Sequence, residues 1–163
     1  MNTQQTITQL FAQLSGLAHK LEQLAATLQQ EQAALAQNAF TAIEKLAQDK
    51  ETLSGEIEQL ERQRFAVCKQ LNIDIDFASI QAYLDGISAV LVERLEQQWN
   101  TIITLGSQCA SQNQLNGILV AHQQRHTQQA LAILRGISGN SEVYSASGSQ
   151  QQVIDQQHSL GRV

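Results

Sequence analysis

Apolar residues recur in alternating steps of three and four along the first part of the chain. This spacing forms the a/d seam of a coiled-coil-like helix, and it predicts a helix over about residues 3–36. Further apolar residues stand one position after each d residue, so we expect this helix to contact two neighbours rather than one. The seam comprises Ile7, Leu10, Leu14, Leu17, Leu21, Leu24 and Leu28, and Phe11, Ala18 and Ala25 widen it.

A second seam predicts a helix over about residues 39–71. Two seam positions hold Lys50 and Arg64, whose long stems can lie along an apolar face while the charge stays in water. Between the two seams the register slips by one residue near Asn38. A turn at Asn38, which tolerates left-handed geometry, explains the slip, and one straight helix is the alternative. The second seam contains Ile43, Leu46, Leu53, Ile57, Leu60, Val67 and Leu71.

The clearest break in the pattern follows Leu71. Asn72 is suited to a left-handed C-cap, and Asp74 or Asp76 to the N-cap of the next helix. A short helix is predicted over about residues 77–86, ending near Gly86, with Ser88 available to cap a restart.

The third apolar pattern predicts a long helix over residues 89–135 that ends at a Gly136 C-cap. At about 70 Å it is expected to be the backbone of the fold, with both earlier helices packed along it as an antiparallel bundle. The predicted class is therefore all-α: an elongated antiparallel bundle or coiled coil of three to four helices. Residues 1–136 form the bundle, and residues 137–163 form a flexible or partly helical tail for partner binding.

Composition agrees with this class and limits the partners. Aromatic residues make up 4% of the chain and Pro is absent, which favours helix over strand. The net charge of −5 argues against nucleic-acid binding. No signal peptide or membrane-spanning apolar run is recognised, so a cytoplasmic protein without membrane insertion is expected. Cys68 and Cys109 lie far apart, as expected of reduced structural thiols.

No motif indicates catalysis. His122 and His126 stand four residues apart, a spacing that lets two imidazoles reach one metal ion. The Glu that zinc hydrolases place beside the first His is missing, since Gln123, Gln124 and Arg125 intervene. We therefore predict no catalytic residue, metal or cofactor, and a metal-binding helical enzyme using the two histidines is the less favoured alternative.

Two amides and a glycine interrupt the long helix at Asn113, Asn116 and Gly117. A buried amide in a helical seam costs stability but fixes register, and a glycine lets another backbone come close. A surface Asn pair with a tolerated Gly explains the same spacing. Both interpretations are open on the sequence.

Several features together resemble the FlgN-type flagellar type III export chaperones over nearly the whole chain. The specific part is Asn113-x-x-Asn116-Gly117-x-Leu119-Val120 followed by Tyr144-Ser-Ala-Ser-Gly148. The others are Glu31-Gln-Ala-Ala-Leu35, Lys50, Arg64, Trp99 and Leu131-x-x-Leu134-x-Gly136. The chain departs from the family at Asn72, where Gly is common, and at Ser145 and Ser147, where the tail more often reads Tyr-Gly-Ala-Asp-Gly.

The resemblance implies a cytosolic chaperone that binds hook-associated proteins, prevents their premature assembly and delivers them to the export apparatus. Cargo is expected to dock as an amphipathic C-terminal helix on the end of the long helix and the tail. The matching cargo residues are Leu119, Val120, Ala130, Leu131 and Leu134. Tyr144 matches the family residue that docks to the export gate protein FlhA. A monomer or weak homo-oligomer is expected, and a structural coiled-coil scaffold or adaptor is the alternative.

Overall fold

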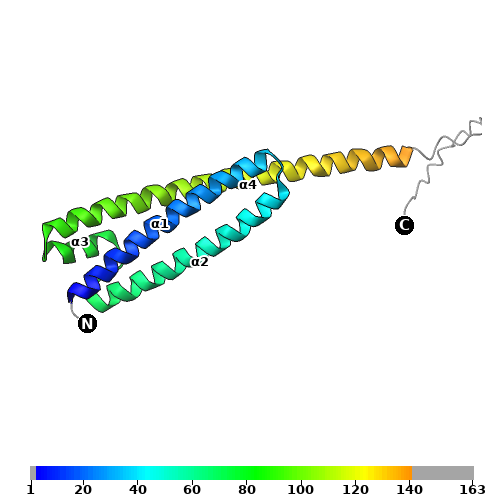
Figure 1. Ribbon diagram of the computed structural model, residues 1–163. Coiled ribbons are helices and arrows are strands. Elements are labelled where there is room, and N and C mark those ends of the chain that lie inside the picture. The colour runs from blue at the N-terminus through cyan, green and yellow to red at the C-terminus, as the bar shows by residue number, and fades with distance from the viewer. Residues whose placement is uncertain (1–2, 141–163) are drawn as a thin grey trace, which may run out of the picture. The chain divides into compact units, whose positions relative to one another are not determined.

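The computed structural model describes residues 3–140 of the chain, and all of its regular structure in that range is helical. The four helices are α1 (Thr3–Ala36), α2 (Phe40–Leu71), α3 (Phe77–Asp85) and α4 (Ala89–Asn140), as Figure 1 shows. The all-α prediction is confirmed. The predicted end of the long helix at Gly136 is wrong, because α4 continues to Asn140. A glycine costs a helix only about 1 kcal/mol relative to alanine, so Gly136 alone does not stop it.

The chain divides into two compact units, residues 1–123 and residues 124–163. The first unit contains α1, α2, α3 and the first part of α4. The predicted division into residues 1–136 and 137–163 stays a prediction, because residues 141–163 lie outside the described part of the chain.

The first two chain reversals each contain an asparagine whose backbone is in the left-handed conformation. Asn38 has φ 54° and Asn72 has φ 57°. The Asn72 N–H donates to the Lys69 carbonyl, and the Ile73 N–H donates to the Cys68 carbonyl, which satisfies the last carbonyls of α2. Of the two interpretations of the Asn38 register slip, the turn is correct.

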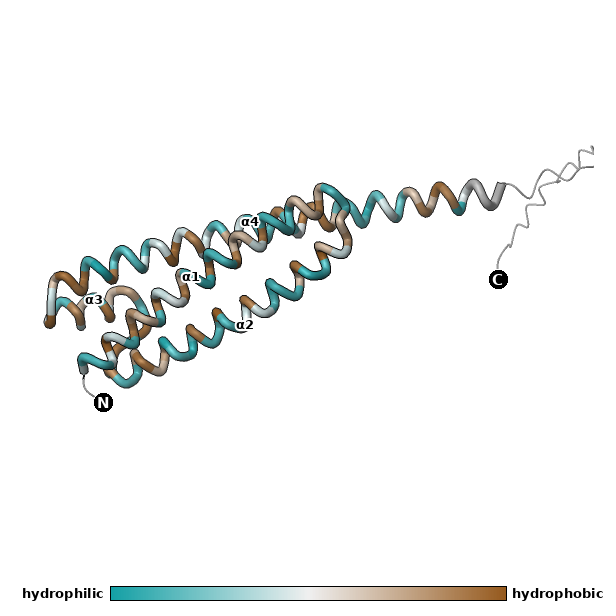
Figure 2. The backbone as a smooth tube through the Cα atoms, viewed as in Figure 1, coloured by the Kyte–Doolittle hydropathy of each residue, from teal (hydrophilic) through white to brown (hydrophobic). Residues whose placement is uncertain are grey.

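The middle of the first unit is formed by α1 rather than by α4. Twelve residues of α1 are buried, against three of α2. The predicted second stripe on α1 is confirmed at Phe11 and Ala25, which are buried beside the main seam. In Figure 2 brown apolar turns alternate with teal polar turns along α2, in line with a helix that buries one narrow face. The expectation that the longest helix is the backbone of the fold is wrong, because the described part of α4 buries three residues, Leu95, Cys109 and Asn116, against twelve in α1.

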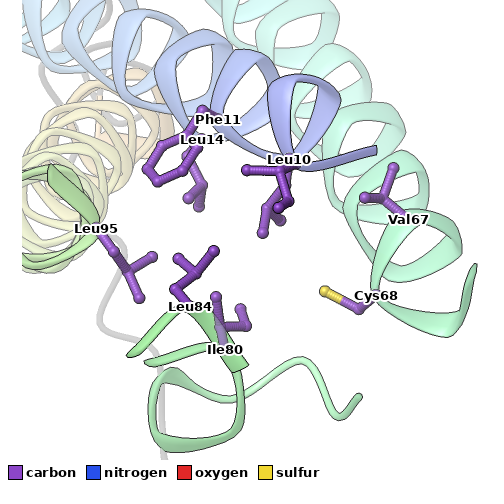
Figure 3. Close-up of a cluster of buried hydrophobic side chains, with 9 residues drawn as sticks. Leu10, Phe11, Leu14, Val67, Cys68, Ile80, Leu84 and Leu95 are labelled. Carbon is purple, nitrogen blue, oxygen red and sulfur yellow. The ribbon is translucent and has the colours of Figure 1, made fainter. Parts of the chain in front are cut away.

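A cluster of side chains from all four helices closes one end of this unit. Figure 3 shows them pointing toward one another: Leu10, Phe11 and Leu14 from α1, Val67 and Cys68 from α2, Ile80 and Leu84 from α3, and Leu95 from α4. The short helix α3 covers only this end. Because α3 is too short to cross the unit, α4 starts beside the end of α2 and runs antiparallel to it. It therefore runs parallel to α1, unlike the expected arrangement in which α4 is antiparallel to both.

Asp76 is the N-cap residue of α3, and its contribution to stability depends on pH. Its side chain accepts hydrogen bonds from the Ser79 N–H at 2.9 Å and the Ser79 hydroxyl at 2.7 Å. These bonds hold the pKa of the Asp76 carboxyl below its usual value.

Because the pKa of Asp76 is lower in the folded state, its ionised carboxylate stabilises the fold at pH values above the unfolded carboxyl pKa of about 3.9. This stabilisation is lost as the pH falls through the pKa of the folded state. We expect Asp76→Ala to lower the stability measured by urea unfolding at pH 6, and the difference from the parent chain to shrink below pH 4. Asp74→Ala, two residues earlier and not the N-cap, is the matched control. An equal, pH-dependent loss in the control would contradict this assignment.

Candidate functional site

Three α4 side chains at seven-residue spacing hydrogen bond to backbone carbonyls of α1. Cys109 Sγ donates to the Leu21 carbonyl at 3.5 Å, and Asn116 Nδ2 donates to the Leu28 carbonyl at 2.9 Å. Gln123 Nε2 donates to the Leu35 carbonyl. Each pair is separated by 88 positions in the sequence. This polar ladder fixes α1 and α4 in one parallel register.

Asn116 also joins an ion pair that connects α1 and α2. Its Nδ2 lies 2.8 Å from Glu31 Oε2, so both hydrogens of the amide nitrogen have acceptors. Lys50 Nζ lies 2.7 Å from the other Glu31 oxygen. Asn116 is 3% exposed and Glu31 is 6% exposed. One carboxylate thus connects all three long helices, because it accepts from α2 and α4 and belongs to α1.

The structure decides between the two interpretations of the Asn113–Gly117 stretch. Asn116 is a buried register residue, whereas Asn113 is exposed and lines a groove of about 380 Å³ with α1 and α2. Three residues correspond to about 300° of helix rotation. When Asn116 faces α1, Asn113 therefore lies at the edge of the α1–α4 contact. The expected close approach at Gly117 is wrong: a Cβ built there meets nothing within 4 Å.

Gln123 and Glu31 complete the polar site, and apolar spacing did not identify them. Gln123 Nε2 also lies 3.2 Å from Asn38 Oδ1, so it connects the end of α1 with the turn into α2. The signal was present in the sequence as polar or weakly polar residues at Cys109, Asn116 and Gln123, spaced by seven. A seam of polar residues is not detected from the spacing of apolar positions alone.

The two basic residues of the second seam, Lys50 and Arg64, both form ion pairs with carboxylates. Lys50 binds Glu31, as described above. The Arg64 guanidinium lies 2.6 Å from Glu61 Oε2, donates to the Ile75 carbonyl at 3.0 Å and stacks 5.3 Å from the centre of the Trp99 ring. Arg64 therefore connects α2 with the α2–α3 connection and α4.

Both cysteines are free and buried, in two different apolar clusters of the first unit. Burial raises the pKa of the Cys109 thiol, and it is also the largest influence raising the pKa of Cys68, against the lowering effect of Arg64. A neutral buried thiol is a poor nucleophile. The expectation of structural thiols agrees with this environment.

His122 and His126 are both exposed on α4. Within residues 3–140 no three His, Cys, Asp or Glu side chains lie together in a way that would hold a metal ion. No helix in the same range is long and apolar enough to cross a membrane.

The residues predicted to bind cargo fall in two groups. In the first unit Leu119 is half-buried, and Val120 is 36% exposed. In the second unit Ala130, Leu131 and Leu134 are exposed, with Leu131 at 46% and Leu134 at 60%. Ile133, also exposed, was not predicted. Tyr144 lies outside the described residues.

The second group lies in a fully exposed part of α4. Every residue from Gln124 to Gly136 is exposed. Three large apolar side chains are among them: Leu131, Ile133 and Leu134.

Comparison with known proteins identifies the family. The family model described as FlgN protein matches residues 1–152 of the chain. The comparisons with curated proteins and with solved structures give no match. FlgN proteins are chaperones that bind flagellar substrate proteins, and they are not an enzyme family. The chain therefore belongs to the FlgN family of flagellar export chaperones.

Proposed function

We propose that this chain is a cytoplasmic type III export chaperone for hook-associated proteins, the junction proteins between flagellar hook and filament. It keeps them from assembling prematurely and delivers them to the export apparatus. The observation that carries the proposal is the exposure of Leu131 and Leu134, two large apolar side chains in a part of α4 where every residue is exposed.

The cargo surface consists of Ala130, Leu131 and Leu134. These three positions fall within about 100° of the helix circumference, the width of an apolar strip, and Leu131 and Leu134 are neighbours at i and i+3. An amphipathic helix of the cargo packs its apolar face against such a strip. Leu119 and Val120, in the first unit, are also proposed to bind cargo.

The size of the strip suits a chaperone that must release its cargo. Full burial of each leucine contributes about 2 kcal/mol, part of which is offset by ordering of the partner. Further affinity has to come from residues after Gly136. Tyr144, in that region, is proposed to dock to the export gate protein FlhA.

The scaffold alternative is less well supported by the packing of α1. A scaffold that self-associates through the first seam needs residues such as Leu14 and Leu21 for contacts between chains. Leu14 is 0% exposed and Leu21 is 9% exposed within a single chain. The seam is already occupied by α2 and α4.

Calorimetric titration of the full chain with a purified hook-associated protein tests the cargo surface. We expect Leu131→Lys combined with Leu134→Lys to weaken binding about 100-fold, because two charges must be desolvated against an apolar helix. Far-UV circular dichroism is expected to stay unchanged, since both positions are exposed.

Ile87→Lys combined with Val90→Lys is the matched control. These two apolar residues are also exposed, at 49% and 72%, but lie beside the start of α4. We expect parent-like affinity from this control. Parent-like affinity in the Leu131/Leu134 variant, or an equal loss in the control, would place the cargo elsewhere.

A further inference from the structure

The outward face of α4 lacks charge over an unusual length. Residues 97–124 contain no Asp, Glu, Lys or Arg, although charged residues make up 15% of the chain. The stretch is about 42 Å of helix. By contrast, α2 carries charges throughout its exposed face, from Glu44 to Lys69. Depletion of charge at an exposed surface is the compositional mark of the core of a protein interface.

The uncharged face has a definite order of large and small side chains. It lies on the side of α4 opposite Asn116, and all six of its residues are exposed: Ile103, Ser107, Ala110, Ser111, Gln114 and Ile118. The two isoleucines at its ends are 59% and 56% exposed. Four uncharged residues lie between them, and Ser107, Ala110 and Ser111 of these are small.

The two isoleucines are equally far from the midpoint between Ala110 and Ser111, and we propose that the face binds a second copy of this chain. The two α4 helices pair antiparallel about a two-fold axis at that midpoint. Each Ile103 then lies opposite Ile118 of the second copy, each Ala110 opposite Ser111, and each Ser107 opposite Gln114. Isologous contacts of this kind need one surface that is complementary to itself.

The charges that border the face select the antiparallel pairing. Glu96 is the last charged residue before the uncharged run, and Arg125 is the first after it. Glu96 precedes Ile103 by seven residues and Arg125 follows Ile118 by seven, so both continue the same stripe of α4. The proposed register brings Glu96 of each copy level with Arg125 of the other. A parallel register would place like charges together.

The area of the proposed contact predicts a weak dimer. With the bordering Glu96 and Arg125 the contact is about 44 Å long, and at about 10 Å wide it covers about 440 Å² on each copy, about half of what a standard stable interface buries per partner. The dimer is therefore expected to form at high concentration and to dissociate on dilution. It uses none of the residues proposed for cargo binding.

Sedimentation equilibrium of the full chain over a concentration series tests the proposal. We expect reversible dimers in the parent chain, and Ile103→Glu or Ile118→Lys alone to weaken dimerisation at least about tenfold. An equimolar mixture of these two variants is expected to dimerise at least as well as the parent, because the introduced charges of opposite sign face each other across the interface.

A mixture of Ile103→Glu with Ile103→Lys is the register control. In the antiparallel dimer these sites lie about 22 Å apart, so this mixture stays dissociated. Circular dichroism confirms that each variant is folded. The proposal is overturned by a parent chain that remains monomeric at all concentrations, by single variants that dimerise like the parent, or by recovery in the register control.

Discussion

Asn116→Ala is expected to lower the free energy of unfolding by about 3 kcal/mol, the larger of the two stability effects predicted for the polar site. The substitution removes the donors to the Leu28 carbonyl and to Glu31 Oε2. Both acceptors keep another bond, because the Leu28 carbonyl lies inside α1 and Glu31 Oε2 also accepts from Lys50 Nζ at 2.9 Å. The loss is that of two buried hydrogen bonds, one to a neutral acceptor and one to a charged acceptor, which contribute about 1 and about 2 kcal/mol. Urea unfolding followed by far-UV circular dichroism measures the loss.

Asn113→Ala provides a control with the same change in chemistry three residues away. Asn113 is exposed, and surface substitutions usually change stability by less than about 0.5 kcal/mol. The expected difference between the two variants is therefore several-fold. Equal losses would show that Asn116 does not have the buried bonding partners described above.

Lys50→Met is expected to destabilise the chain by about 2 kcal/mol. Methionine keeps most of the stem but leaves the buried Glu31 carboxylate without its cation, and removing one partner of a buried pair is more costly than removing both. Because the Lys50 side chain is 24% exposed, water reduces the effect below that of a fully buried pair. Glu31→Gln combined with Lys50→Met is expected to be more stable than Lys50→Met alone.

Lys20→Met is the matched control for this pair. Lys20 also binds a carboxylate across α1 and α2, at 2.8 Å from Glu56, but Glu56 is 44% exposed. Exposed ion pairs contribute about 0 to 1 kcal/mol. A loss in Lys20→Met as large as that in Lys50→Met would mean that burial of Glu31 does not matter.

The local structure of this chain is largely readable from its sequence. The heptad seam and the left-handed asparagines at 38 and 72 are set by neighbouring residues, and the structure confirms both. Of the two candidate N-caps, Asp74 and Asp76, the structure selects Asp76. Their energies come from short-range geometry, so one sequence is sufficient. Gly136 is the exception, because the cost of one glycine is too small to end a helix.

The tertiary arrangement was harder to predict, for a physical reason. Whether α4 runs parallel or antiparallel to α1 depends on whether α3 crosses the unit, and helix periodicity does not carry that information. Likewise, the partner of Glu31 is fixed by two residues far away in sequence, Lys50 and Asn116. The sequence left open whether Asn113 and Asn116 are buried or exposed, and a turn of about 300° between them puts only Asn116 against α1.

The two units differ in chemistry. Buried amides and one ion pair fix the register of the first unit, and the exposed leucines of the second unit are the proposed cargo surface. The measurement that tests this division most directly is amide hydrogen exchange of the full chain with and without a hook-associated protein. The account predicts new protection over residues 124–136 and unchanged exchange in α1 and α2. Protection confined to α1 and α2, with none over residues 124–136, would contradict it.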